Sequence, residues 1–203
     1  FCLHYVSHAN LCADGDLLLL DVGASYANYN SDITRTIPVS GRFTRRQRQV
    51  YDAVLGILRR CIAGLAVGKK IKEWQKEAEQ MTERELVNLG LLTMPEIKRQ
   101  DPEQPACNKD CRHGVGHPIG LDVHDVGLIT KPMEAGWVMT VEPGIYIPKE
   151  NFAVRLENTV LVTKNGPVDL MPNIPIEADE IEQLMREPST HGKNGNGKAA
   201  KTR

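Results

Sequence analysis

The sequence predicts an α+β protein with a mostly antiparallel sheet. Residues 1–40 contain apolar and β-branched runs separated by Gly, Asp and Asn, a pattern typical of short strands and turns. Between residues 44 and 90, apolar side chains recur at helical spacing. Strand-like runs return between residues 136 and 171. Strands, then helices, then strands is the order expected of an α+β fold.

The first half of the chain is expected to hold three strands and two helices. The strands are predicted at 1–6, 15–24 and 31–39. The first helix is predicted at 44–67, because Thr44 and Gln47 have the spacing of a capping box and Gly68 can end the helix. Its expected buried stripe is Tyr51, Val54, Leu55, Leu58, Ile62 and Leu65. The second helix is predicted at 71–90, with Trp74, Ala78, Met81, Leu86 and Leu89 buried.

The second half begins with a polar segment at 91–112. Strands are predicted at 136–147, 152–163 and 167–171, and a short helix at 177–186. Residues 187–203 have almost no apolar side chains, so we expect a disordered polar tail there. The expected organisation is therefore a partial catalytic domain at 1–186 and a tail at 187–203.

The composition argues against several classes of partner. Lys and Arg number 25 and Asp and Glu 26, for a net charge of −1, so neither nucleic acid nor a membrane is expected as a partner. No apolar run approaches the roughly 18 residues of a membrane span. Five cysteines at irregular spacing indicate reduced thiols and a cytoplasmic protein. The chain lacks an initial Met and a signal peptide, and we expect it to begin partway through a longer protein.

The stretch 21–32, DVGASYANYNSD, begins and ends with a carboxylate and contains no positive charge. If it forms a hairpin with its turn at Tyr26 and Ala27, Asp21 lies opposite Asp32. Directly opposed side chains share a face of the sheet, with Cβ atoms about 5 Å apart. Two carboxylates at that separation repel each other. We therefore expect the hairpin to bring both acids to a metal ion.

A second hairpin repeats this arrangement. Glu142 and Glu157 lie in strand-like runs on either side of IPKENF. A turn at Lys149 and Glu150 places the two acids opposite each other, provided that no bulge interrupts either strand. Each acid pair alone is weak evidence for a site, because acids flank turns in most proteins.

Three histidines occur in the stretch 112–125, RHGVGHPIGLDVHD. In an extended segment His113 and His117 face the same way, and Pro118 and Gly120 break the strand and redirect His124. The alternative is a glycine-rich loop with surface histidines. Four carboxylates with at least one imidazole and no thiolate suit Mn²⁺, with Co²⁺, Fe²⁺ or Zn²⁺ as substitutes. Four acids also suit two ions about 3.5–4 Å apart.

Several motifs occur together in one order: LLLDVGASYANYNSDITRTIPVSGRFT, HGVGHPIGLDVHD, VMTVEPGIYIP and VRLENTVLVT. They closely resemble the pita-bread metallopeptidases over about residues 2–186, most of all aminopeptidase P (Xaa-Pro aminopeptidase) and next Xaa-Pro dipeptidase (prolidase). The resemblance implies a pita-bread fold, a mostly antiparallel curved sheet with packed helices, incomplete at the N-terminus. It also implies that the full-length protein is a homo-oligomer.

The resemblance implies a centre of two divalent metal ions. The positions that match the family's ligands are Asp21, Asp32, His117, Glu142 and Glu157. By resemblance, Asp21 is terminal on one metal, His117 and Glu142 bind the other, and Asp32 and Glu157 bridge the two.

The resemblance also implies roles for side chains around the metals. His113, His124 and His4 match substrate-binding histidines, and Tyr146 is expected at the border of the pocket, although a buried core tyrosine is an equal alternative. The implied catalytic residues are His113, His124, Glu142 and Arg155. Thr34 and Thr36 resemble partners of the ligands, although threonines in strands usually only pack.

The implied reaction is hydrolysis of the peptide bond between an N-terminal residue and proline, in peptides with proline at the second position. Glu142 would carry a proton to the proline nitrogen, which has no N–H in the peptide. Three alternatives stay open: a dipeptidase that cuts only Xaa-Pro dipeptides, a peptide-binding module without catalysis, and an inactive fragment. The stretches 28–44 and 173–185 favour the aminopeptidase, and the presence of all five ligands argues against the binding module.

Overall fold

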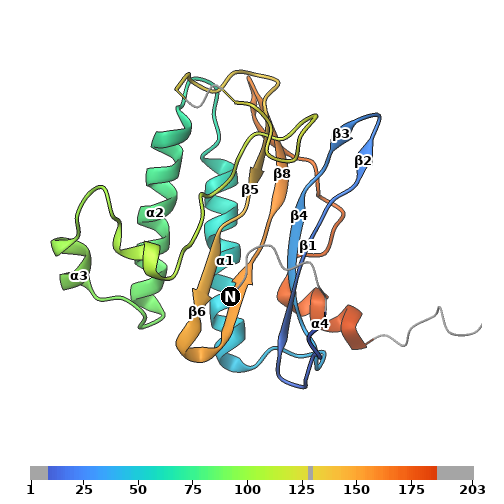
Figure 1. Cartoon of the computed structure of the whole chain (residues 1–203), viewed down its shortest axis with the longest axis vertical. Coiled ribbons are helices and arrows are strands. Elements are labelled where there is room, and N and C mark those ends of the chain that lie inside the picture. Colours follow the sequence, from blue (N-terminus) through green and yellow to red (C-terminus); the bar gives the residue numbers. More distant parts are fainter. Residues whose placement is uncertain (1–8, 128–129, 187–203) are drawn as a thin grey trace, which may run out of the picture.

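The computed structural model describes residues 9–127 and 130–186 (Figure 1). The strand expected at 1–6, with His4, and the tail expected at 187–203 lie outside the described residues. Within them, all strand pairs are antiparallel, and the strands precede and follow the helices. The predicted α+β class is therefore confirmed.

The elements follow the predicted order. The first strands are β1 (Leu17–Val22), β2 (Ser25–Tyr26), β3 (Tyr29–Asn30) and β4 (Ile33–Pro38). The helices α1 (Arg45–Ala63), α2 (Ile71–Asn88) and α3 (Met94–Arg99) and the 3₁₀ turn η1 (Ala106–Lys109) come next. The last elements are β5 (Val138–Val141), β6 (Gly144–Ile147), η2 (Pro148–Glu150), β7 (Phe152–Arg155), β8 (Asn158–Thr163), β9 (Gly166–Asp169) and α4 (Ala178–Arg186).

Helix α1 begins at the predicted capping box. The Thr44 hydroxyl accepts the Gln47 N–H at 3.2 Å, and the Gln47 side chain accepts the Thr44 N–H at 2.8 Å. The helix ends at Ala63, four residues before the predicted end. Gly68, where the end was expected, has φ of 91° and donates its N–H to Met133. The chain therefore leaves the helix early and turns at the glycine.

The hydrophobic core lies between the helices and the strands of the second half. Helix α1 contacts α2 and also β5, β6, β7 and β9. Most of the predicted stripes are buried; Ile62, Met81 and Leu89 are only partly buried. No helix in the described ranges is long and apolar enough to cross a membrane.

The register predicted for the first hairpin is wrong. Its turn lies at Ala27 and Asn28, whose φ angles are 50° and 65°. A two-residue turn of this kind requires positive φ at both of its residues. Asn28, in the observed turn, adopts positive φ more readily than Tyr26, which the predicted turn would have used. The shift of one residue in the turn places Asp21 opposite Thr34 instead of Asp32.

The register predicted for the second hairpin is confirmed. The β5–β8 and β6–β7 pairs share one register, and this register places Glu142 across from Glu157. The turn contains η2, followed by Asn151 in the left-handed conformation. Both glutamates lie between the two strand pairs, where regular pairing is interrupted.

Candidate metal centre

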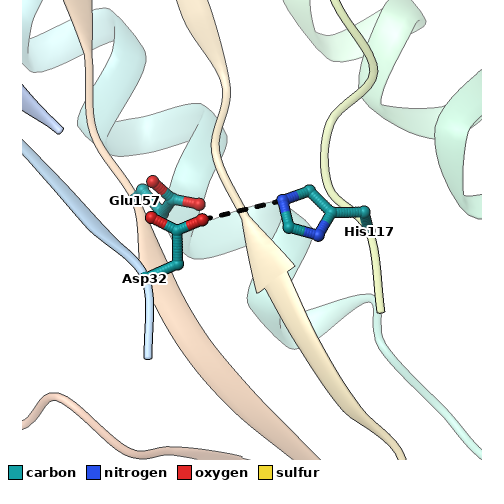
Figure 2. Close-up of side chains that lie close together, drawn as sticks. All are labelled: Asp32, His117 and Glu157. Atoms are coloured by element: carbon teal, nitrogen blue, oxygen red, sulfur yellow. Dashed lines mark ion pairs between the residues drawn. The ribbon is translucent and has the colours of Figure 1, made fainter. Parts of the chain in front are cut away.

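Three side chains from distant parts of the sequence converge at one place. Asp32 precedes β4, Glu157 lies between β7 and β8, and His117 lies in the segment before β5. One ligand atom from each lies within 4.8 Å of the other two. Figure 2 shows the imidazole of His117 directed toward the two carboxylates. Asp32 and Glu157 are buried, so the three groups form an internal cluster.

Strand β4 holds the two carboxylates together. The Thr34 hydroxyl donates to Glu157 Oε2 at 2.7 Å, and the Glu157 N–H donates to the Thr34 carbonyl at 3.0 Å. The Asp32 carbonyl accepts a hydrogen bond from the Thr159 hydroxyl at 2.8 Å. Arg35 donates to the carbonyls of Thr34 and Glu157 at 2.9 and 2.7 Å. Backbone and side-chain bonds therefore fix the position of Glu157.

The histidine segment, residues 113–117, runs beside β5. The Glu142 N–H donates to the Val115 carbonyl at 2.7 Å, and the Thr140 N–H donates to the His117 carbonyl at 2.8 Å. The Thr140 hydroxyl also accepts the His117 N–H at 2.9 Å. These bonds bring His117 Nε2 to 3.5 Å from Glu142 Oε1 and 3.8 Å from Asp32 Oδ2.

The protonation of His117 follows from its hydrogen bonds. Its Nδ1 lies 2.9 Å from the Pro118 carbonyl, which can only accept a hydrogen bond. In the neutral ring Nδ1 therefore carries the proton, and Nε2 presents its lone pair to Asp32 and Glu142. A metal-binding histidine characteristically has this arrangement.

Asp21 forms an ion pair with Arg155, and its carboxyl group also shares a side-chain hydrogen bond with Asp32, which contributes to the raised pKa of Asp32. Arg155 is buried, and it also donates to the Tyr146 hydroxyl at 3.1 Å and to the Thr34 hydroxyl at 3.2 Å. The Thr34 hydroxyl thus joins Arg155 to Glu157. Arg155 therefore lies in the interior beside the acids and not on the surface.

The other two histidines border the same place. His113 Nδ1 lies 3.6 Å from Glu142 Oε2, and His113 Nε2 lies 2.7 Å from the Tyr146 hydroxyl. The ring of His124 lies 4.1 Å from the ring of His117, measured between centroids. Of the predicted site residues, only His4 lies outside the described chain.

Burial makes ionisation of the carboxyl groups unfavourable. Burial, followed by repulsion from neighbouring carboxylates, raises the pKa of Asp32 to about 6, that of Glu142 to about 7 and that of Glu157 to about 8. Burial also lowers the pKa of His113, so this ring is neutral at pH 7.

Comparison with known proteins identifies the family. Residues 2–164 match the model of metallopeptidase family M24. The chain belongs to metallopeptidase family M24. The fold expectation is also confirmed, because the structure is similar to zinc-substituted aminopeptidase P of E. coli in complex with product, with a TM-score of 0.82, 37% identity, and coverage of 90% of this chain and 44% of that one.

Curated relatives of this M24 chain include two Xaa-Pro aminopeptidases. Xaa-Pro aminopeptidase 3 of Homo sapiens is 39% identical over 198 residues, 92% of this chain and 38% of the relative. Xaa-Pro aminopeptidase of Haemophilus influenzae is 39% identical over 199 residues, 90% of this chain and 45% of the relative. The chain thus spans about two fifths of the length of these M24 relatives.

The residues present fit the metal that an M24 metallopeptidase requires. Glu157 Oε1 is buried without a hydrogen-bond partner among the described residues, and such an atom is costly unless something compensates for it. Carboxylate oxygens with one imidazole are suitable ligands for a divalent metal ion. The M24 family and the zinc-substituted relative support a divalent metal ion as the cofactor.

Two supporting residues of this M24 site were not predicted. Thr140 bonds to both the N–H and the carbonyl of His117; its position two residues before Glu142 in a strand was the available signal. Gln75 accepts the Val115 N–H at 2.7 Å. No pattern in the sequence indicates that contact, because Gln75 lies on α2, forty residues before Val115.

Proposed function

We propose that this chain carries the catalytic centre of an Xaa-Pro aminopeptidase, which hydrolyses the bond between an N-terminal residue and proline. The observation that carries the proposal is the convergence of Asp32, His117 and Glu157. Glu142 adjoins this cluster at 3.5 Å from His117. The sequence identity to Xaa-Pro aminopeptidases supports the choice of substrate.

We propose two divalent ions, most consistently Mn²⁺, with Co²⁺, Zn²⁺ or Fe²⁺ as substitutes. The ligands in the proposal are Asp21, Asp32, His117, Glu142 and Glu157. Four carboxylates with one partly compensating arginine leave more negative charge than a single dication neutralises. When bound, the metals supply Lewis-acid polarisation of the substrate carbonyl and activation of water.

The chain's own groups position the substrate and transfer a proton. Arg155 donates to the Tyr146 hydroxyl, which leaves that hydroxyl to donate its proton to His113 Nε2. His113 Nδ1 in turn donates to the Gly114 carbonyl at 2.8 Å. This chain of bonds keeps His113 neutral and fixed beside Glu142. Glu142 Oε2, which faces His113, is the oxygen that we assign to deliver a proton to the proline nitrogen.

The proposed specificity follows from the chemistry of proline. A peptide bond before proline has no N–H, so an enzyme that holds the scissile N–H does not bind it productively. A centre that holds the carbonyl oxygen and the free amine of the first residue has no such requirement. His124, whose ring lies tilted against the ring of His117, is placed where it can contact the residues beside the scissile bond.

We also propose a cytoplasmic location, supported by the free thiols of Cys12, Cys61, Cys107 and Cys111. Assembly of the full-length protein into a homo-oligomer stays a prediction.

The test uses the metal-free 203-residue chain with added Mn²⁺. We expect release of the first residue from an Xaa-Pro-Yaa tripeptide, lost on metal removal and in Asp32→Asn. Asp52→Asn, on the exposed face of α1, is the matched control and should leave the rate unchanged. Cleavage of an Xaa-Pro dipeptide alone would establish the dipeptidase. Tight Mn²⁺ binding without cleavage would contradict the proposal in favour of a binding module or an inactive fragment.

A further inference from the structure

Gln75 connects helix α2 to the histidine segment. Its side-chain oxygen Oε1 accepts the Val115 N–H at 2.7 Å, and its Nε2 donates to Glu79 Oε1 at 3.0 Å. Because a carboxylate can only accept, the bond to Glu79 determines which end of the amide faces Val115. The two hydrogen bonds thus fix both the position and the orientation of the Gln75 side-chain amide.

Val115 is held from both sides. Its N–H donates to Gln75, and its carbonyl accepts the Glu142 N–H at 2.7 Å. Val115 is 5% exposed, so its N–H is shielded from water while Gln75 is in place. His113 lies two residues before Val115 and His117 two residues after it, so both histidines depend on where this residue lies.

The neighbouring residue on α2 makes a contact of a different kind. Trp74 packs against Gly116, and a Cβ atom added to Gly116 would lie 3.0 Å from the indole ring. This apolar contact packs against the histidine segment but does not determine the position of that segment along β5. The hydrogen bond between Gln75 and Val115 does determine this position, because it joins one side-chain oxygen to one backbone N–H.

We propose that Gln75 is a positioning residue, which fixes His113 and His117 relative to Glu142 through the backbone of Val115. The inference rests on the proposed function, because His117 and Glu142 are ligands only in that proposal. Gln75 touches neither substrate nor metal in it. Loss of its acceptor oxygen should therefore change the affinity for metal through the placement of His117.

The test measures the Kd of the metal-free chain for Mn²⁺ by calorimetric titration, together with unfolding by denaturant. Gln75→Met keeps the length of the side chain and removes the acceptor. We expect it to weaken Mn²⁺ binding by about 10- to 100-fold, the range typical of lost partners behind metal ligands. Gln75→Glu keeps an acceptor oxygen and should recover part of the affinity.

Thr82→Val is the matched control. Thr82 is buried on the same helix and donates its hydroxyl to the Ala78 carbonyl at 2.8 Å. This variant should lower stability and leave the Kd for Mn²⁺ unchanged. If Gln75→Met does not fold, Glu79→Ala provides the second measurement: it frees the Gln75 amide to rotate and should weaken Mn²⁺ binding to a smaller extent.

The outcomes separate the inference from the proposed function. If the wild-type chain binds Mn²⁺ tightly and Gln75→Met binds it equally well, the inference about Gln75 is overturned and the proposed function is not. Thr82→Val weakening Mn²⁺ binding as much as Gln75→Met also overturns it, because the effect would then follow general destabilisation of α2. A wild-type chain that binds no Mn²⁺ refutes the proposed function and the inference together.

Discussion

Replacement of Gly116 by alanine should push the histidine segment away from β5. A Cβ atom at this position would lie 2.0 Å from the Thr140 carbonyl oxygen and 2.8 Å from its carbon. Both are backbone atoms of a strand, so a side-chain rotation cannot relieve the contact. The segment must move by about 1 Å or more to reach ordinary van der Waals separation.

The expected loss of stability follows from the contacts that this movement disturbs. Overpacking a buried site costs about 1–3 kcal/mol. Two hydrogen bonds join His117 and Thr140: the Thr140 N–H donates to the His117 carbonyl, and the His117 N–H donates to the Thr140 hydroxyl. Each is worth about 1 kcal/mol. The reduced freedom of the unfolded alanine chain returns about 0.4–1 kcal/mol. We therefore expect Gly116→Ala to lower the free energy of unfolding by about 2–5 kcal/mol.

Gly114→Ala is the matched control within the same segment. A Cβ atom there meets the Gln75 Oε1 at 3.5 Å and the Gly116 carbonyl oxygen at 4.0 Å, which are ordinary contacts. Denaturant unfolding of the metal-free chain should place this variant within about 1 kcal/mol of the wild type. The reasoning is refuted if Gly116→Ala is as stable as the wild type, or if Gly114→Ala is destabilised equally.

Three further outcomes are expected. The metal-free chain should lose stability as pH rises from about 4 to about 8, measured by denaturant midpoints. The raised pKa values of Asp32, Glu142 and Glu157 mean that the folded state binds protons more tightly than the unfolded state; added Mn²⁺ should reverse the trend. Arg35→Lys should cost about 2–4 kcal/mol, because lysine cannot replace the four hydrogen bonds that the buried guanidinium makes, and an unchanged thermal midpoint would contradict this. Thr44→Ala should cost about 1 kcal/mol through loss of the helix cap without changing the affinity for Mn²⁺.

Local chemistry explains which features could be predicted from the sequence. The start of α1 depends on Thr44 and Gln47, three residues apart, and was predicted correctly. The register of the second hairpin depends on a turn beside Asn151, and Glu142 and Glu157 face each other as expected. Each of these features is determined within a few residues of the chain.

The errors arise where small local preferences or distant contacts decide the outcome. In the first hairpin, the tolerance of Asn28 for positive φ moved the turn by one residue. That single step moved the cross-strand partner of Asp21 by two residues, to Thr34. Residues two apart in a strand share a face, so Asp21 still contacts Asp32, and it also forms an ion pair with Arg155. Helix α3 and the turn η1, within the segment described only as polar, carry no apolar periodicity, because all of α3 is at least partly exposed.

The hydrogen bond between Thr34 and Glu157 closes a loop of 123 residues. Bringing such distant positions together costs conformational entropy before any contact compensates for it, and folds dominated by long-range pairing form slowly. The carboxylates therefore meet only after β4, β7 and β8 have assembled, and the unfolded chain offers no comparable cluster to a cation. A divalent ion that binds only the folded chain shifts the equilibrium between the folded and unfolded states. At concentrations above its Kd, it stabilises the folded state in proportion to the logarithm of its concentration.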